Sequence, residues 1–246
     1  IIRAMNKQSN TYTIIYIIAL VVVVGAALAF TAMSLKPLQQ INADADKMRQ
    51  ILASVHLVPS NDNIKPEFDK YITRQFIVNA DGEELSGDAF NIDVAQESKI
   101  KDSAERQLPV FQCKLDNGDI KYILPVYGAG LWGPIWGYVA INSDGKSIYG
   151  AHFAHQGETP GLGAEIEKPN FSGQFKDKRV FIDGQFKSVA VVKAGQKPLD
   201  GEDYVDGISG GTITSKGVEA MLSNCLAPYK SFLSNLSKDN NNGTKK

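Results

Sequence analysis

The chain of 246 residues has few cysteines and histidines, the side chains that hold most transition metals. The two cysteines are Cys113 and Cys225, and the three histidines are His56, His152 and His155. These residues do not show metal-ligand spacing, so no metal site is expected. Two cysteines are too few for a disulfide scaffold. Buried free thiols are the favoured interpretation, and a disulfide between the two is the alternative.

An excess of positive charge is also missing. Lys and Arg total 26, against 27 Asp and Glu. Residues 1–36 contain three of the basic residues, Arg3, Lys7 and Lys36, and no acid, so the remainder is mildly acidic. Binding to nucleic acid needs a basic face, and that class of function is therefore excluded.

The stretch from Ile14 to Met33 contains no charged residue. At about 1.5 Å per residue it can cross a hydrocarbon core of roughly 30 Å, which predicts a transmembrane helix over residues 13–35. Residues 1–12 would form a short cytoplasmic N-terminus. A cleaved signal peptide is the alternative, because small residues follow the apolar run. The flanking lysines and arginines do not fix the orientation.

A helical or mixed connecting part is expected over residues 36–108. Pro37 is expected to end the membrane helix. An amphipathic helix at about 37–55 and a short helix at about 65–74 should follow.

From residue 109 the pattern changes to strands and tight turns, so residues 109–236 are predicted to form the main domain. A short helix is expected at 171–175 and a last helix at about 215–236, with Thr214 or Ser215 as its N-cap. The polar tail 237–246 is expected to be disordered. The predicted fold class is α+β, with one N-terminal transmembrane helix before an antiparallel sheet with flanking helices. Three hairpins are predicted: 110–115 with 120–126, 137–141 with 147–154, and 180–182 with 186–192.

The most informative stretch, residues 206–215, reads Asp-Gly-Ile-Ser-Gly-Gly-Thr-Ile-Thr-Ser and leads into the last helix. Glycines let backbone N–H groups approach a phosphate, and a helix N-terminus favours negative charge. Hydroxyl groups add donors or an attachment point. Taken alone, the same residues could form an ordinary turn and cap. They match neither the P-loop nor the dinucleotide fingerprint.

Two further stretches are rich in glycine. Residues 156–163 read Gln-Gly-Glu-Thr-Pro-Gly-Leu-Gly, and residues 127–137 contain both tryptophans of the chain, Trp132 and Trp136. Trp and Leu in such loops could wall a planar ring. A core aromatic cluster beside a tight turn would give the same composition.

Together, the three stretches resemble the motifs of the FMN-binding domain family. The segments Gly128–Trp132, Gly157–Gly163 and Asp206–Ser215 occur in the family's order. The resemblance runs from the apolar segment to about residue 235 and is weakest over 56–108. Within the family, the chain is most similar to the C subunits of sodium-translocating NADH:quinone oxidoreductases. The family usually has Ala where this chain has Gly211.

The resemblance implies one covalent FMN, joined through its phosphate to Thr212 by a separate magnesium-dependent flavin transferase. Thr214 is the rival acceptor. Asp206 would belong to the motif that the transferase recognises, and no catalytic residue is expected in this chain. Ser209, Gly210 and Gly211 would shape the phosphate cradle. The ribityl chain or ring would be approached by Glu158, Thr159, Leu162, Gly163 and Trp132.

The implied function is electron transfer within a membrane complex of the oxidoreductase and translocase type. FMN would accept electrons from an iron–sulfur centre and pass them to a flavin in a partner subunit, between NADH and quinone, coupled to sodium export. The implied location is the bacterial inner membrane, with the domain on the periplasmic side. The isolated chain should not turn over. The alternatives are the equivalent FMN subunit of the Rnf ferredoxin:NAD oxidoreductase, a non-redox membrane-tethered binding or assembly protein, and a flavin reductase.

Overall fold

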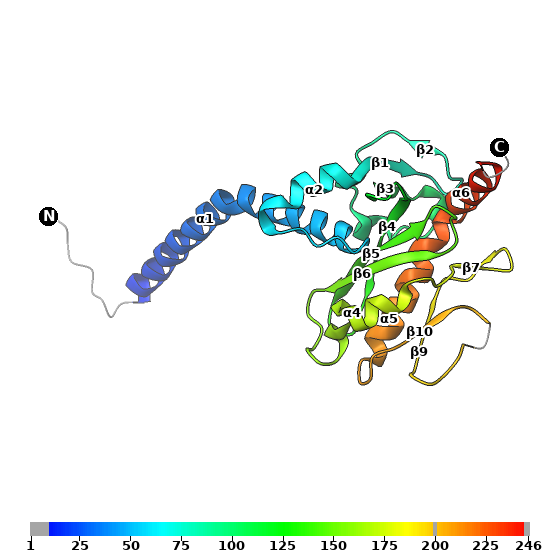
Figure 1. Ribbon diagram of the computed structural model, residues 1–246. Coiled ribbons are helices and arrows are strands. Elements are labelled where there is room, and N and C mark those ends of the chain that lie inside the picture. Colours follow the sequence, from blue (N-terminus) through cyan, green and yellow to red (C-terminus); the bar gives the residue numbers. More distant parts are fainter. Residues whose placement is uncertain (1–9, 199–200, 244–246) are drawn as a thin grey trace. The chain divides into compact units, whose positions relative to one another are not determined.

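The computed structural model describes residues 10–198 and 201–243 (Figure 1). The chain forms two compact units, residues 1–47 and 48–246. Within the described residues, α1 (Asn10–Ala53) is the one helix long and apolar enough to cross a membrane. It contains the predicted span 13–35. Most of the predicted N-terminal segment 1–12 lies outside the described residues.

The prediction that Pro37 ends the membrane helix is wrong, because Pro37 lies inside α1. A proline removes only one backbone donor and disturbs one preceding turn. Leu38, Gln39 and Gln40 follow it, and all three favour helix. The predicted amphipathic helix at 37–55 is therefore the second part of α1 and not a separate element.

The second unit is built on a six-stranded antiparallel sheet with the order β2-β1-β3-β4-β5-β6. The first two predicted hairpins are confirmed as β3–β4 and β5–β6. Gly118 and Gly145 take positive φ values of 87° and 67° in their turns, a conformation that glycine adopts at little cost. The strands are β1 (Ile72–Val78), β2 (Glu84–Leu85), β3 (Leu108–Lys114), β4 (Ile120–Ala129), β5 (Pro134–Asn142) and β6 (Ile148–His155).

Strands β1 and β2 lie in the segment for which the sequence predicted helical or mixed structure. The predicted short helix at about 65–74 is present as α2 (Ile64–Tyr71), but it ends at Tyr71, and residues 72–74 belong to β1. Thr73, Arg74 and Gln75 interrupt the apolar pattern of β1, since all three are exposed. Antiparallel pairing with β3 includes this strand in the main sheet.

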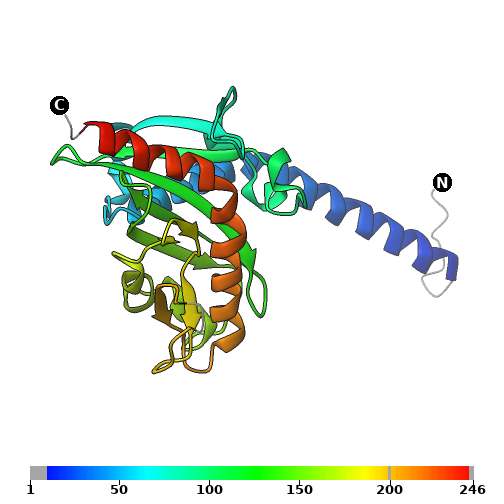
Figure 2. The ribbon, with the colours of Figure 1, turned by 90° about the vertical axis from the view of Figure 1, so that its right-hand side faces the viewer.

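Alternate residues of the sheet enter two separate cores, as the pleat of a strand requires. Val110 and Leu124 belong to the core covered by α5 (Thr212–Leu226). Phe111 and Ile123 belong to the other core, with α2 and the last turns of α1. Figure 2 shows the orange α5 running along the green sheet. The α+β class with helices flanking an antiparallel sheet is therefore confirmed.

The third predicted hairpin is confirmed only in its first part, β7 (Phe181–Ile182) with β8 (Gln185–Phe186). The predicted strand 186–192 is interrupted at Ser188, a buried residue with a φ of +60°. After this turn, β9 (Ala190–Val192) pairs in parallel with β10 (Tyr204–Asp206). This parallel pair places the end of β10 directly before the glycine-rich segment.

Short helices fill the remaining connections. The predicted helix at 171–175 is present as α4 (Pro169–Ser172) and a following 3-10 turn. Elsewhere there is α3 (Val94–Glu97). The 3-10 turns are η1 (Asn61–Asn63), η2 (Ala89–Asn91), η3 (Ser103–Glu105), η4 (Gly163–Glu167), η5 (Gly173–Phe175) and η6 (Ala227–Tyr229).

The C-terminal helix differs from its prediction at both ends. It begins at Thr212, three residues early, with Gly211 as the N-cap in place of Thr214 or Ser215. Pro228 interrupts it in η6, after which α6 (Lys230–Gly243) continues. The prediction of a disordered tail is therefore wrong for residues 237–243, because the helix extends through the polar Ser and Asn residues. Residues 244–246 lie outside the described part.

The two cysteines are free and buried on opposite faces of the sheet. Cys113 belongs to the core beside α2, and Cys225 belongs to the core beneath α5. The sheet separates the sulfurs, which confirms the interpretation as free thiols. Burial raises the pKa of Cys113 from its ordinary value of 9.0 to about 11, and it also raises the pKa of Cys225.

Both thiols should resist alkylation in the folded protein at pH 8 and react fully after denaturation, as counted by mass spectrometry. Because the folded pKa of Cys113 is raised, its stabilising contribution is complete below pH 9 and decreases as the pH rises toward 11. The free energy of unfolding should fall by about 1 kcal/mol between pH 9 and pH 10 from this group alone. The fall should be smaller in Cys113→Ala. A rapidly labelled native thiol would contradict the assignment of both cysteines to the cores.

Candidate functional site

The three glycine-rich segments, far apart in the sequence, meet around the side chain of Glu158. Its carboxylate is buried, with 5% of the residue exposed. The backbone N–H of Trp132 donates to Oε1 at 2.9 Å, and the hydroxyl of Thr214 donates to Oε2 at 2.6 Å. The backbone N–H of Glu158 donates to Nδ1 of His155 at 3.1 Å. One carboxylate therefore joins the β4–β5 turn, the loop after β6 and the first turn of α5.

Two glycines make room for this carboxylate. A Cβ atom at Gly130 would collide with Oε1 of Glu158, and one at Gly163 would collide with Oε2. The Gly163 Cβ would also lie 2.6 Å from the Thr214 hydroxyl. The glycines at these two positions are thus needed for close packing and not only for turn formation.

The two candidate acceptor threonines have different environments. Thr214 is 1% exposed and its hydroxyl is held by Glu158. Thr212, the first residue of α5, is exposed. The N-cap residue is Gly211, which has no side chain to bind the N–H groups of the first turn. This arrangement leaves a helix N-terminus beside a reachable hydroxyl group.

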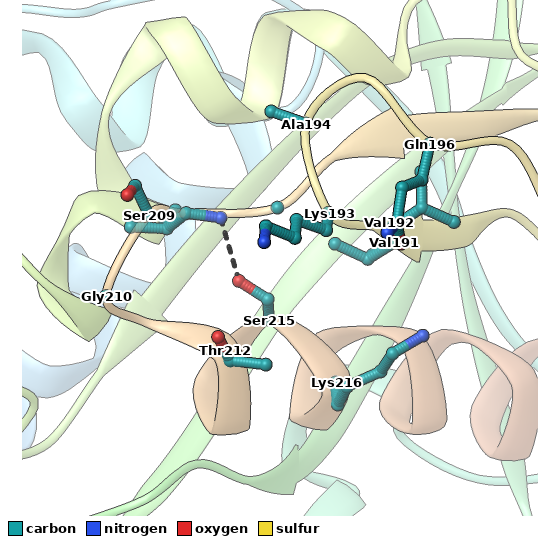
Figure 3. A pocket seen from close by; sticks show the side chains of 12 residues that line it. Val191, Val192, Lys193, Ala194, Gln196, Ser209, Gly210, Thr212, Ser215 and Lys216 are labelled. Atoms are coloured by element: carbon teal, nitrogen blue, oxygen red, sulfur yellow. Dashed lines mark hydrogen bonds between the residues drawn. The ribbon is translucent and has the colours of Figure 1, made fainter.

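A cavity of about 420 Å³ opens beside Thr212 (Figure 3). Its walls come from β9 and the loop after it, the 207–210 segment and the start of α5. The hydroxyl oxygen of Ser215 accepts a hydrogen bond from the Ile208 N–H at 2.9 Å and fixes the segment above the helix. In Figure 3 the side chain of Lys193 lies across the cavity between this segment and α5. The remaining walls include Val191, Val192, Ala194, Gln196, Gly207, Ser209, Gly210 and Lys216.

The loop before α5 has a tightly determined shape. Gly210 has a φ of +76°, and a Cβ there would lie 2.6 Å from Cδ2 of Leu162. The N–H of Gly211 donates to the carbonyl of Ile208 at 3.0 Å. A Cβ at Gly211 would lie 3.1 Å from Cγ2 of Ile208, so an alanine would require a small shift of that side chain. The Gly211 of this chain thus fits its loop without adjustment.

Large apolar side chains stand exposed around this loop. Trp132 is 69% exposed and Ile213 is 59% exposed, while Leu131 and Leu162 are exposed at 48% and 41%. Each comes from one of the three glycine-rich segments. We refer to these four residues as the apolar rim. Exposed aromatic and aliphatic side chains of this kind can pack against a planar aromatic ligand.

Comparison with known proteins agrees with this geometry. An FMN-binding domain model matches residues 130–227. NqrC of Vibrio anguillarum, the C subunit of its Na(+)-translocating NADH-quinone reductase, is 34% identical over 231 residues, which cover 88% of this chain and 90% of that protein. The chain belongs to the NqrC family. The corresponding protein of Neisseria meningitidis serogroup B is 34% identical over 233 residues, covering 88% of this chain and 90% of that protein.

Solved structures of the NqrC family share the fold. The crystal structure of the protein from Parabacteroides distasonis, again the C component of a Na(+)-translocating NADH-quinone reductase, is 52% identical, with a TM-score of 0.76. The match covers 81% of this chain and 97% of that chain. Shewanella oneidensis NqrC is 27% identical, with a TM-score of 0.66, and the match covers 80% of this chain and 99% of that chain. These matches confirm the resemblance that the three motifs indicated.

The structure brings most of the predicted site residues of this NqrC family member together. Gly163, Ser209, Gly210 and Gly211 lie in the two loops next to Thr212, and Thr159 is exposed on the loop after β6. Asp206 is exposed at the end of β10. Its backbone N–H donates to Gln174 at 2.9 Å. No group of three or more metal-binding side chains occurs within residues 10–198 and 201–243.

Sequence reasoning missed part of the cavity wall. The sequence predicts Val191 in a hairpin strand and assigns no role to Lys193, and the parallel pairing of β9 with β10 brings both beside the loop before α5. Ser215 was expected to cap the helix, whereas its hydroxyl oxygen holds the backbone of Ile208. Ile208 shows no signal in the sequence beyond its place among the glycines.

Substitution of Gly210 by alanine should lower the free energy of unfolding of the detergent-solubilised chain by about 2 kcal/mol, measured in urea. The new Cβ would have an unfavourable φ and press on Leu162. Gly184→Ala is the matched control. Gly184 has a φ of +79° with nothing within 4 Å of a Cβ, so only about 1 kcal/mol should be lost. Equal losses would show that Leu162 moves aside freely.

Proposed function

We propose that this chain is the FMN-carrying electron-transfer subunit of a sodium-translocating NADH:quinone oxidoreductase, with FMN joined through its phosphate to Thr212. The observation that carries the attachment site is the contrast between the two threonines: the Thr212 hydroxyl is reachable at the helix N-terminus, whereas Thr214 is buried and hydrogen-bonded to Glu158. Family membership and the FMN-binding domain match support the cofactor.

The residues before α5 fit a phosphate. The N-cap Gly211 has no side chain to bind the N–H groups of the first helical turn, so these groups would be available to a phosphate. Ser209 would add a hydroxyl donor, and Gly210 lets the backbone turn close to the phosphate oxygens. Lys193 lines the neighbouring cavity and would bring positive charge toward the phosphate, whereas the Lys216 ammonium is paired with Glu219 at 2.9 Å.

The apolar rim and the cavity would receive the rest of the cofactor. Trp132 and Leu162 present flat or flexible apolar surface for the ring. Gly163 and Thr159 would lie along the ribityl chain. Bound FMN would supply a centre that accepts and releases single electrons, while the protein adjusts its potential through burial and hydrogen bonding.

The ester would retain the cofactor in a shallow site. A rim in which Trp132 is 69% exposed cannot bury a ring completely, so noncovalent contacts alone would bind it weakly. Electrons would arrive from an iron–sulfur centre and leave to a flavin of a partner subunit. The N-terminal part of α1 would hold the chain in the inner membrane, with the domain in the periplasm and close to these partners.

Co-expression of the full chain with a flavin transferase should give an ultraviolet-fluorescent band on denaturing electrophoresis. The intact mass should increase by one FMN less one water. Thr212→Val should lose both signals because the acceptor oxygen is absent. Thr73→Val, an exposed strand threonine, is the matched control and should stay fluorescent.

If the Thr212→Val band is fluorescent and the Thr214→Val band is dark, Thr214 is the attachment site instead. A colourless wild-type protein in the presence of an active transferase would instead favour a non-redox tethered protein and contradict the proposal.

The orientation can be tested by labelling with a membrane-impermeant maleimide. Asn235 is exposed on α6, so Asn235→Cys should be labelled in intact spheroplasts if the domain is periplasmic. Lys7→Cys, on the other side of the apolar segment, should be labelled only after lysis. The reverse pattern would place the domain in the cytoplasm.

A further inference from the structure

We propose that Glu158 is the positioning residue of the flavin site, which acts through Thr214 and Trp132 and not by touching the flavin. The inference rests on the proposed function and changes the role that the sequence predicted for Glu158. It assigns to one buried carboxylate the task of holding the acceptor hydroxyl and the aromatic wall at a fixed separation.

The carboxylate is already engaged by the protein. Oε1 accepts from the Trp132 N–H and Oε2 from the Thr214 hydroxyl, and only 5% of the residue is exposed. Hydrogen bonds to an ionised carboxylate are about twice as strong as those between neutral groups. A flavin in the exposed rim would therefore meet the backbone and ring of Trp132, while Glu158 stays behind them.

Each of the two bonds fixes a different part of the site. Thr214 lies two residues after Thr212 in the first turn of α5, so holding its side chain fixes the rotation of that turn and the direction of the Thr212 hydroxyl. The Trp132 N–H is in the turn between β4 and β5, so the second bond fixes the aromatic wall. Without the carboxylate, the β4–β5 turn and the first turn of α5 could still fold, but no hydrogen bonds would connect them and set the distance between them.

Two glycines of the motifs agree with this role. Gly130 and Gly163 stand against the two carboxylate oxygens, where any side chain would collide with Glu158. By contrast, a Cβ at Gly157 or Gly161 would meet nothing within 4 Å. Gly130 and Gly163 thus enclose Glu158, which is expected if the carboxylate, and not the cofactor, requires glycine at these two positions.

Four variants separate positioning from stability. Glu158→Ala leaves both donors without a partner. Thr214→Val removes one donor while nearly keeping the side-chain shape. Thr214→Ser keeps the hydroxyl. Glu158→Gln can still accept from Trp132 through its oxygen and donate to Thr214 through its nitrogen. Glu105→Gln, at an exposed position, is the control.

The full chain is treated with transferase, magnesium and FAD, and the rate of mass increase is followed. Thr214→Val should be modified about tenfold more slowly, as expected for the loss of one charge-assisted hydrogen bond, and Glu158→Ala, which loses two such bonds, should be slower still. The midpoint potential of their attached flavin should move toward that of free FMN. Thr214→Ser and Glu105→Gln should match the wild type in both measurements, and Glu158→Gln, which keeps both hydrogen bonds without the charge, should fall between the wild type and Glu158→Ala. Thermal unfolding identifies a variant that fails to fold. If Glu158→Ala does not fold, the comparison is made between Thr214→Val and the wild type.

A readout that does not need the flavin tests the same coupling. In a Trp136→Phe background, the fluorescence anisotropy of Trp132 should fall in Thr214→Val because the turn is released from α5. Wild-type rate, potential and anisotropy in Thr214→Val would overturn the positioning role. A wild-type chain without FMN would defeat the proposed function instead, and the anisotropy would then decide the positioning role alone.

Discussion

The candidate site depends on one constraint: both oxygens of a buried carboxylate must accept hydrogen bonds. Glu158 is closed off from solvent, and burial of an ionised group without hydrogen-bond donors would cost several kcal/mol. Its donors, the Trp132 N–H and the Thr214 hydroxyl, come from segments separated by about 80 residues in the sequence. Satisfying one side chain therefore brings the β4–β5 turn, the loop after β6 and the start of α5 together, and the glycines of these segments provide the space.

The sheet provides the frame on which this constraint can act. Strands β4, β5 and β6 are consecutive and antiparallel. The β4–β5 turn and the C-terminal end of β6 therefore lie at the same end of the strands. Helix α5 packs along the sheet through Val218, Met221 and Leu222, which brings the N-terminus of the helix to that end of the strands. The parallel pairing of β9 with β10 continues as far as Gly207, whose N–H donates to the carbonyl of Val192 at 2.7 Å. Core packing of α5 and the pairing of β9 with β10 thus position the loop before α5 close to Glu158.

Local signals were sufficient for the central hairpins and for the motif that identified the family. Asn117-Gly118 and Asp144-Gly145 predict turns because glycine tolerates the positive φ found at both positions. The errors have two causes, the helix preference of neighbouring residues and tertiary contacts. Pro37 reads as a helix end, yet its neighbours continue the helix. The stretch 186–192 reads as one strand, yet a left-handed Ser188 separates β8 from a strand that pairs with distant residues. The roles of Glu158 and Lys193 could not be predicted, because they depend on which segments meet.

The exposure of Thr212 has a consequence for the order of maturation. Its hydroxyl is at the surface while the core beneath α5, including Val218 and Leu222, is fully buried. If FMN is attached at Thr212 as proposed, the acceptor hydroxyl is presented by the finished fold, and no part of that core needs to open for the ester to form. Under that proposal folding could precede cofactor attachment, and a cell short of riboflavin would accumulate a folded subunit without FMN that remains competent for later loading.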